Sequence, residues 1–348
     1  MDKSINFDKN IVIIGAGLSG LATAYFLEKK HNISPLILEA REAPGGRMQS
    51  DSSIELGATW LGPEHSHLLE LLDELNIATF PQYKAGKSVF IHGAANPPHY
   101  FDADQNSTYR ITGGSTRLFT RLKEQTKAKI NCGKTVQSIS EKDGELQIIT
   151  PNHSFSAEKV ILTIPPQLAS QTIQFTPSLP EELLTEMRST PTWMSNAIKI
   201  GLLFDKPYWR EKGLSGTLIA PNGPVMELYD HSTQNDEKIS LMGFTNEALR
   251  GKSPQQRQKI IINFLAEHMG KFIKNHSAYI EKDWQADPFT ATELTESIYM
   301  HPTYGSNVWK QPYMNGKLLF SGSETSSVHG GYMEGAVASA KNAANFKT

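Results

Sequence analysis

The sequence contains little that indicates an oxidising compartment, a membrane or nucleic acid. Its 348 residues include one cysteine, Cys132, so no intrachain disulfide can form and a reducing compartment is expected. No apolar run approaches the roughly 18 residues of a membrane helix, and the polar N-terminus lacks the basic-then-apolar order of a signal peptide. The 34 basic residues do not exceed the 36 acidic ones, which gives no sign of nucleic-acid binding. We therefore expect a cytoplasmic protein with no membrane or nucleic-acid partner.

Patterns of metal and nucleophile chemistry are missing as well. The eleven histidines form no H-E-x-x-H pattern, and His65 and His67 lie two residues apart, which is the wrong spacing for one helical face. Cys132 has no second thiol with which to build a zinc site, and no G-x-S-x-G elbow is present. We therefore expect no metal site.

Short apolar runs that alternate with helical patterns predict an α/β protein with a sizeable core. Residues 10–15 (NIVIIG) are typical of a buried parallel strand, a helical pattern follows through Lys30, and a second strand ends near Glu39. From about residue 173 the sequence pattern changes and predicts further strands and helices. This indicates a second, mixed-sheet domain inserted into the first. The end of the chain again predicts a strand and a helix.

The first strand runs into a glycine-rich dinucleotide fingerprint. Gly15, Gly17 and Gly20 match G-x-G-x-x-G between the predicted strand and helix. In this context Gly15 permits a tight turn, Gly17 lets the backbone approach a pyrophosphate, and Gly20 allows close helix–strand packing. Glu39 follows the second strand, where its carboxylate can accept hydrogen bonds from an adenosine ribose. The fingerprint alone fits both NAD and FAD.

The residues that follow Glu39 distinguish the two cofactors. The segment LEAREAPGGRM (38–48) adds two glycines and Arg47, which can pair with a phosphate. This segment resembles the flavin-containing amine oxidase superfamily, which binds FAD in this way. The segment IELGATWLG (54–62) resembles the same family's flavin-contacting stretch, although Glu55 stands where the family commonly has Asp.

The resemblance continues along the chain. TYRITGGSTRL (108–118) resembles the family's second glycine pair, and KTVQSI (134–139) resembles the strand whose valine, here Val136, meets the adenine. The most specific match is LLFSGSETSSVHGGYMEGAVASAKNAA (318–344), in which Glu324 matches the glutamate that helps to hold the flavin chain. The helix that begins near Met333 is expected to point its N-terminus at the flavin, where negative charge collects on reduction.

The resemblance implies an α/β fold with an FAD-binding Rossmann-like (βαβ, GxGxxG) domain and an inserted, smaller α+β substrate domain that contains a mixed sheet. We predict residues 8–82, 113–170 and 290–346 for the FAD-binding domain and 83–112 and 171–289 for the substrate domain. Relatives have a long helical excursion where this chain has residues 85–112, which carry one predicted strand at 88–92, so we expect a reduced substrate domain and a more open entrance.

The cofactor implied by the resemblance is FAD. We expect it to be held non-covalently, because no cysteine lies in the turn where mammalian monoamine oxidases attach it. The predicted cofactor-binding residues are Gly15, Gly17, Ser19, Gly20, Glu39, Ala40, Arg41, Gly46, Arg47, Gly57, Ala58, Thr59, Trp60, Val136, Trp284, Gly322, Ser323, Glu324, Tyr332, Met333 and Ala336. The chain ends at Thr348, shortly after the last predicted helix, so we expect no C-terminal membrane anchor.

Lys199 is the first candidate catalytic residue. Alternation along the predicted strand 197–204 favours an ordinary structural interpretation, a lysine on the wetter face of the strand. The segment also resembles the family's strand that ends in Pro-x-Trp, whose lysine holds a water against flavin N5. The resemblance therefore implies that the Lys199 ammonium fixes this water and assists the reaction of reduced flavin with O₂.

The other candidates are aromatic. Tyr332 in GGYMEGA matches one wall of the family's aromatic cage, which orients the amine, although a packing tyrosine at a helix start is the simpler interpretation. Trp284 matches the Trp-x-x-Asp-Pro neighbourhood of the family. Residues 290–304 replace the family's usual turn, and Tyr299 is the candidate for the second wall. This departure puts a two-walled cage in doubt.

Three hypotheses stay open from the sequence. The first is oxidation of a small amine with FAD and O₂, giving an imine and H₂O₂. The second is another flavin oxidoreductase on the same scaffold, namely an amino-acid oxidase, a desaturase or an NAD(P)H oxidase. The third is a non-catalytic FAD-binding protein. The oligomeric state and the identity of the amine are not predicted.

Overall fold

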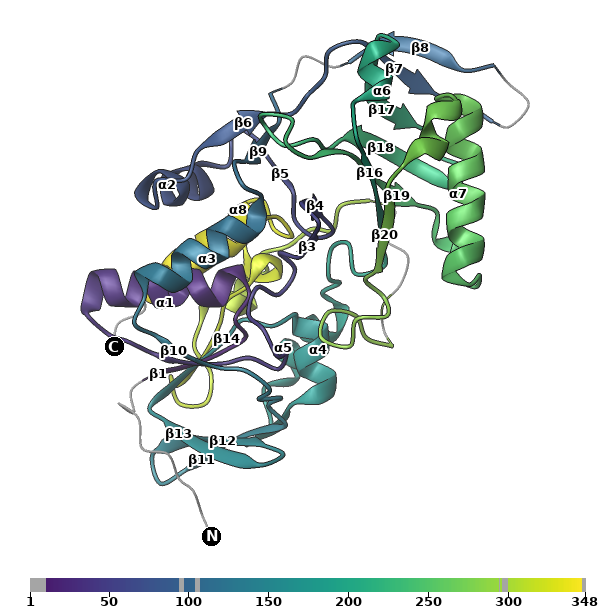
Figure 1. Cartoon of the computed structure of the whole chain (residues 1–348). Helices are drawn as coiled ribbons and strands as arrows, with labels where there is room; N and C mark the ends of the chain where they lie inside the picture. The colour runs from purple at the N-terminus through teal and green to yellow at the C-terminus, as the bar shows by residue number, and fades with distance from the viewer. Residues whose placement is uncertain (1–10, 94–96, 104–106, 294, 296–299, 346–348) are drawn as a thin grey trace.

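The computed structural model describes residues 11–93, 97–103, 107–293, 295 and 300–345. Two sheets dominate it, a parallel sheet packed with helices and a mixed sheet of seven strands at the other end of the molecule (Figure 1). Within the described residues, no helix is both long and apolar enough to span a membrane.

The parallel sheet collects strands from distant parts of the chain. Its order is β10 (Lys129–Asn131), β2 (Leu36–Leu38), β1 (Ile11–Ile14), β14 (Lys159–Leu162) and β21 (Leu318–Phe320), with every neighbouring pair parallel. Strands β2, β1 and β21 are buried along their whole length and β14 from Val160 onward, because layers of structure cover both faces. This is why their sequences are continuous apolar runs rather than alternating ones.

Helices cover one face of this sheet and a second sheet covers the other. The helices on the first face are α1 (Leu18–His31), α3 (Ser115–Gln125) and α8 (Met333–Ala344). The layer on the opposite face consists of β13 (His153–Ala157), β12 (Glu145–Thr150), β11 (Ser138–Lys142), β15 (Gln174–Thr176), α4 (Pro166–Thr172) and α5 (Glu181–Ser189). Ile13 faces the helices, whereas its neighbours Val12 and Ile14 face the second sheet.

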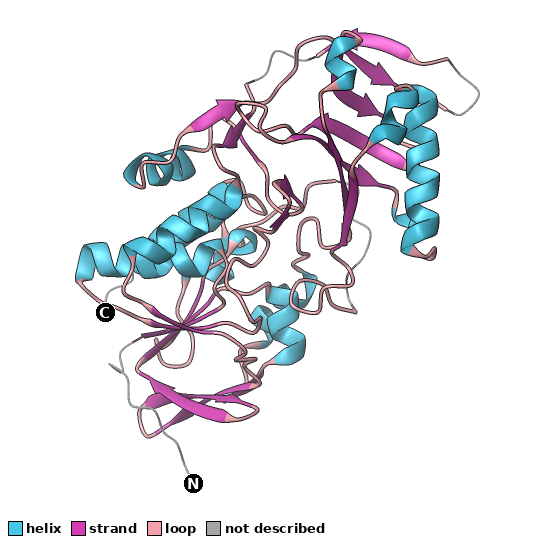
Figure 2. Cartoon of the chain, viewed as in Figure 1, coloured by secondary structure: helices cyan, strands magenta, loops and turns pink. Residues whose placement is uncertain are grey.

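The seven-stranded sheet forms the other end of the molecule. Its order is β20 (Ala278–Asp283), β16 (Ile198–Phe204), β19 (Ile239–Thr245), β18 (Val225–Asp230), β17 (Leu214–Ile219), β7 (Lys87–Phe90) and β8 (His99–Asp102). Only the β17–β7 pair is parallel. Helix α7 (Pro254–His268) lies along one face (Figure 2), and a capping box at Ser253 starts it. The other face turns toward the parallel-sheet region.

The remaining elements are smaller. They are β3 (Ser50–Asp51) with β4 (Ile54–Glu55), the sheet of β5 (Trp60–Leu61), β9 (Tyr109–Ile111) and β6 (Thr79–Pro81), the helices α2 (Ser66–Glu74) and α6 (Tyr208–Glu211), and the 3₁₀ turns η1 (Glu247–Leu249), η2 (Lys271–Asn275), η3 (Asn307–Lys310) and η4 (Ser323–Thr325). Ile54 and Leu56 pack against Met242 of the seven-stranded sheet. The segment around β4 therefore contacts both ends of the molecule.

The predicted α/β fold with a mixed second sheet is confirmed. The prediction of one strand within residues 85–112 is wrong, because β8 pairs with β7 and β9 lies in the three-stranded sheet. Strand β8 has mostly exposed side chains at a sheet edge, so its sequence carries no apolar alternation. The predicted domain ranges stay a prediction; the structure packs β15 and α5, within 171–289, against the parallel-sheet region.

Gly20 gives a test of the tight contact between α1 and the turn after β1. A Cβ at this position would lie 2.0 Å from the carbonyl oxygen of Gly15, so the turn has to shift in a Gly20→Ala variant. We expect the free energy of unfolding, measured by urea titration, to fall by about 3 kcal/mol. Gly251→Ala is the control, because a Cβ there meets open space and surface substitutions change stability by only about 0.5 kcal/mol. Equal losses in the two variants would contradict the packing argument.

Candidate active site

A cavity of about 1220 Å³ lies between the parallel-sheet region and the seven-stranded sheet. It is lined by all of the predicted cofactor-binding residues except Gly20 and Glu324, and by Lys199. Gly20 instead packs against the Gly15 turn, and Glu324 is buried behind Arg47. Segments from both ends of the sequence therefore meet at one cavity.

The fingerprint glycines form one wall of the cavity. Gly15 has a φ of 104°, a backbone conformation that only glycine adopts without strain. A Cβ on Gly46 would approach the Cα of Gly17 to 3.0 Å, so the two glycine loops are closely apposed. Glu39 accepts backbone N–H bonds from Ala16 at 2.7 Å and from Arg41 at 2.9 Å. An ionised carboxylate has further lone pairs, which leaves Glu39 able to accept ribose hydroxyls.

Two helix N-termini line the same cavity. Helix α1 begins after Gly17 and α8 after Tyr332, and neither N-cap has a side-chain hydrogen bond among the described residues. The first N–H groups of each helix are therefore available to an anion, and each helix dipole places partial positive charge there. This arrangement fits FAD, whose pyrophosphate is negatively charged and whose pyrimidine edge gains negative charge on reduction.

Hydrogen bonds fix the two helices relative to each other. The Ser19 hydroxyl lies 2.7 Å from that of Ser321 at the end of β21, and the Ser339 hydroxyl of α8 accepts the backbone N–H of Gly322 at 3.0 Å. Val136 is buried and lines the cavity between β10 and β11. The N-terminal and C-terminal parts of the predicted cofactor site thus form one rigid unit.

Arg47 and Glu324 form a bidentate ion pair. The Arg47 Nη1 lies 2.7 Å from Glu324 Oε1, and Nη2 donates to Glu324 Oε2 at 3.0 Å and to the Ser323 hydroxyl at 3.1 Å. Burial opposes the charge of Arg47, but the Glu324 carboxylate outweighs it and raises the pKa of the guanidinium. Arg47 therefore stays protonated, and the Glu324 carboxylate already offsets its charge before the predicted contact with a phosphate forms.

Arg41 and Trp284 tie the second wall to the cofactor region. Arg41 Nη2 donates to Asp287 Oδ1 at 2.6 Å and to the Thr290 hydroxyl at 3.1 Å. The Trp284 indole N–H donates to the backbone oxygen of Leu56 at 2.7 Å, and its ring lines the cavity. Residues that follow β20 are therefore anchored to the segments on which FAD is expected to lie.

Lys199 lies in the interior, 3% exposed, on the face of β16 that turns toward the cavity. The interpretation of a lysine on the wetter face of the strand is wrong, because residues 57–60 lie against that face. Its Nζ donates to the backbone oxygen of Gly57 at 2.8 Å and to the Thr59 hydroxyl at 3.0 Å. The ammonium also lies 5.4 Å from the ring centre of Trp60 and 4.9 Å from that of Phe244.

A buried polar cluster lies behind Lys199. Arg110 Nη2 and the Glu55 N–H both donate to His231 Nε2 at 3.1 Å, so this nitrogen carries no proton and the imidazole is neutral. Glu55 Oε1 accepts the N–H of Ser115 at the start of α3, and Oε2 lies 3.6 Å from Arg110 Nε. The departure from the family's Asp at this position therefore places a longer carboxylate in contact with three elements.

Burial controls the charges in this cluster. It lowers the pKa of Lys199 to about 7; the Glu55 carboxylate opposes this shift and the Arg110 guanidinium adds to it. Burial also raises the pKa of Glu55, against the pull of Arg110, and holds the pKa of His231 well below its usual value. Lys199 is therefore a cation that can release its proton near neutral pH.

The aromatic cage is resolved only in part. Tyr332 lines the cavity, but the ring that stacks on it face to face is that of His301, at 5.0 Å and 4°. Tyr299 lies outside the described residues, so the second wall stays a prediction. The aromatic rings that line the cavity are those of Trp60, Trp193, Tyr229, Phe244, Trp284, Phe289 and Tyr332.

The sequence did not reveal several of the cavity residues. Thr163, which donates from its hydroxyl to the Ile14 oxygen at 2.8 Å, sits in the recurrent TIPP passage and could have been found there. Glu227, Tyr229 and Phe244 come from strands β18 and β19 and depend on the pairing of those strands, for which the sequence holds no local signal. Among the described residues, no three His, Cys, Asp or Glu side chains gather as a metal site.

Comparisons with known proteins identify a family. The family model described as flavin containing amine oxidoreductase matches residues 18–100 and 94–345. The chain is 24% identical to the "Probable flavin-containing monoamine oxidase A" of Dictyostelium discoideum over 448 residues, which covers 95% of each protein. It is 23% identical to the flavin-containing amine oxidase A of Canis lupus familiaris, over 94% of this chain and 82% of that protein.

Solved structures show the same fold. A putrescine oxidase bound to putrescine superposes with a TM-score of 0.83 at 22% identity and covers 97% of this chain and 98% of its own. The cyclohexylamine oxidase from Brevibacterium oxydans IH-35A gives a TM-score of 0.83 at 20% identity with the same coverage. The order of sheets and helices described above is thus a known architecture.

The lowered pKa of Lys199 predicts a pH dependence of stability. Between about pH 7 and the usual lysine value of 10.5, the unfolded chain holds a proton that the folded chain has released, so rising pH favours the folded state. Relative to Lys199→Met, the free energy of unfolding of the wild-type protein should rise by up to about 1.4 kcal/mol per pH unit in this window. Urea titrations at several pH values measure it. Parallel curves for the two proteins would show that Lys199 keeps its usual pKa.

Proposed function

Because this chain belongs to the family of flavin-containing amine oxidoreductases, we propose that it binds FAD non-covalently and oxidises a small amine, giving an imine and H₂O₂ from O₂. One observation carries the proposal: Lys199 is buried at the cavity and bound to Gly57 and Thr59, within the stretch that resembles the family's flavin-contacting segment. The proposed catalytic residues are Lys199 and Tyr332, with Tyr299 as a further candidate.

When bound, FAD would supply the redox chemistry, namely acceptance of a hydride from the carbon next to the amine nitrogen and transfer of two electrons to O₂. The chain supplies binding and charge. The N-termini of α1 and α8 would hold the pyrophosphate and the pyrimidine edge, and Glu39 would hold the ribose. The only cysteine, Cys132, is not among the residues that line the cavity, so no thiol is available there for covalent attachment.

Lys199 has two tasks in this proposal. Its ammonium would hold a water beside the cofactor, because two of its three donors are already fixed by Gly57 and Thr59 and the third can bind a water. Its positive charge would favour electron transfer to O₂, which becomes anionic. Both tasks require that Lys199 is protonated. The rings of Trp60 and Phe244 lie beside the ammonium and limit the access of bulk water to it.

The arginines and the aromatic rings of the cavity favour an amine over an amino acid as the substrate. Among the described residues that line the cavity, the arginines are Arg41 and Arg47, and each is paired with a carboxylate, Asp287 and Glu324 respectively. Because a carboxylate already offsets each guanidinium, neither offers an unpaired positive charge to the carboxylate of an amino acid. The apolar rings favour the neutral form of the reacting amine, which must have its lone pair free.

The proposed function is tested on the purified holoenzyme. Bound flavin is confirmed by its absorbance, and bleaching is followed without oxygen against butylamine, benzylamine, alanine and NADPH. Bleaching by the amines, followed by one H₂O₂ per turnover in air, is the expected result. Bleaching by NADPH alone would replace this proposal with an NADPH oxidase, and no bleaching by any compound would favour a non-catalytic flavoprotein.

Substituting Lys199 should slow the reaction with O₂. We expect Lys199→Met to lower kcat/KM for O₂ about 100-fold, the usual cost of removing one preorganised electrostatic group. The wild-type rate should fall as pH rises through about 7, since the Lys199 ammonium loses its proton, and the variant should lack this dependence. Lys206→Met, at an exposed lysine just beyond β16, is the control. Full turnover of Lys199→Met would remove Lys199 from the mechanism.

A further inference from the structure

Three side chains form a row across the cavity face of the seven-stranded sheet. Lys199 on β16 pairs directly with Phe244 on β19, and Phe244 pairs directly with Glu227 on β18. Directly paired residues of antiparallel strands project from the same face. Neighbouring strands lie about 4.8 Å apart, so the Cα atoms of Lys199 and Glu227 are about 10 Å apart. All three residues line the cavity.

A β-bulge puts Glu227 in this row. The register of β18 against β19 shifts between Val225, which pairs with Thr245, and Glu227, which pairs with Phe244. In an unbroken ladder Met226 would face Phe244, and Glu227 would turn to the opposite face, where α7 packs. Bulges re-aim side chains in this way and are concentrated at functional sites. The backbone irregularity therefore serves to direct a carboxylate into the cavity.

The path between Lys199 and Glu227 is aromatic. The ring of Trp60 lies 5.1 Å from that of Tyr229 and 6.2 Å from that of Phe244. The Tyr229 hydroxyl donates to Glu227 Oε2 at 2.8 Å, which fixes the carboxylate at the far end of the rings. A ligand that extends from Lys199 to Glu227 would contact apolar rings along its length and a carboxylate at its far end.

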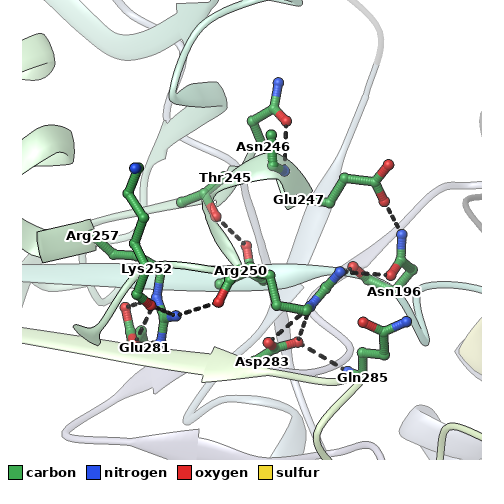
Figure 3. Close-up of polar contacts among 12 residues, drawn as sticks. Asn196, Thr245, Asn246, Glu247, Arg250, Lys252, Arg257, Glu281, Asp283 and Gln285 are labelled. Atoms are coloured by element: carbon green, nitrogen blue, oxygen red, sulfur yellow. Dashed lines mark hydrogen bonds and ion pairs between the residues drawn. The ribbon is translucent and has the colours of Figure 1, made fainter.

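A smaller recess adjoins the cavity and shares residues with it. Asn196, Asn246 and Glu247 line both the main cavity and an adjoining recess of about 390 Å³. Figure 3 shows the Asn196 amide donating to Glu247, and Arg250 held between Asp283, at 2.9 Å, and Asn196. Asp283 offsets the charge of Arg250, and Glu247 places its carboxylate where the cavity and the recess adjoin.

We propose that Glu227 binds a second, protonated amino group of the substrate, so that this protein prefers diamines and longer polyamines to monoamines. The inference rests on the proposed function, because it assumes that oxidation takes place at the Lys199 end. The nitrogen to be oxidised is neutral there, while the distal nitrogen stays an ammonium and donates charge-assisted hydrogen bonds to Glu227. The methylene chain between them lies against Trp60, Tyr229 and Phe244.

The test compares matched pairs of substrates on the holoenzyme, 1,4-diaminobutane with butylamine and 1,6-diaminohexane with hexylamine. We expect wild-type kcat/KM to be at least 10-fold higher for the diamine of each pair, and Glu227→Gln to reduce this ratio about 30-fold, as expected for loss of a partly buried charge pair. Glu227→Asp should retain part of the preference. Glu237→Gln, at an exposed glutamate outside the cavity, is the control and should keep the wild-type ratio.

Binding is measured separately from turnover. Dithionite-reduced holoenzyme without oxygen cannot oxidise an amine, so calorimetry gives the Kd of each compound directly. We expect 1,6-diaminohexane to bind at least 10-fold tighter than hexylamine to the wild type, and equally to Glu227→Gln. An unchanged ratio in Glu227→Gln would overturn the assignment of Glu227 even if amines are oxidised. Silence of every amine in the bleaching assay would overturn the proposed function, and the calorimetry would still decide whether Glu227 binds the distal ammonium.

Discussion

The hydrogen bonds from the Lys199 ammonium to Gly57 and Thr59 join the two halves of the molecule. Lys199 belongs to the seven-stranded sheet, whereas residues 57–59 continue from the glycine loops that carry the dinucleotide fingerprint. An ammonium that is 3% exposed is costly unless its donors are satisfied, so this contact, together with the packing of Ile54 and Leu56 on Met242, holds the two sheets in position. The seven-stranded sheet and residues 57–59 therefore meet at Lys199, and Gly57, Thr59 and Lys199 all line the cavity.

The cluster behind Lys199 shows how the chain carries so many buried charges. Glu55, Arg110 and His231 come from three separate elements, and each is nearly inaccessible to water. The neutral imidazole of His231 accepts two donors, which lets Arg110 and the backbone of β4 meet without a further carboxylate. The Glu55 charge offsets both Arg110 and Lys199, so removal of Glu55 would leave two buried cations uncompensated.

The parts of the site that lie on continuous motifs could be predicted from the sequence. Gly15, Glu39 and Arg47 have local patterns, and the structure brings them to one cavity. The exposure of Lys199 could not be predicted, because alternation identifies the two faces of a strand but not what covers them. Glu227 could not be predicted either. Its direction depends on a one-residue register shift in β18, and a bulge leaves no signature in the sequence of this strand.

The order of strands in the parallel sheet has a consequence for biosynthesis. Strand β21 pairs with β14 across a separation of more than 150 residues, and α8, which packs on α1, consists of residues 333–344. Closing such a long loop is slow relative to local pairing. During translation the glycine loop after β1 is therefore made long before α8, and both are needed for the cofactor site. We expect the cofactor to bind only after α8 has left the ribosome. Until that point, the apolar faces of α1 and β14 that α8 and β21 will cover are exposed surfaces that a chaperone can recognise.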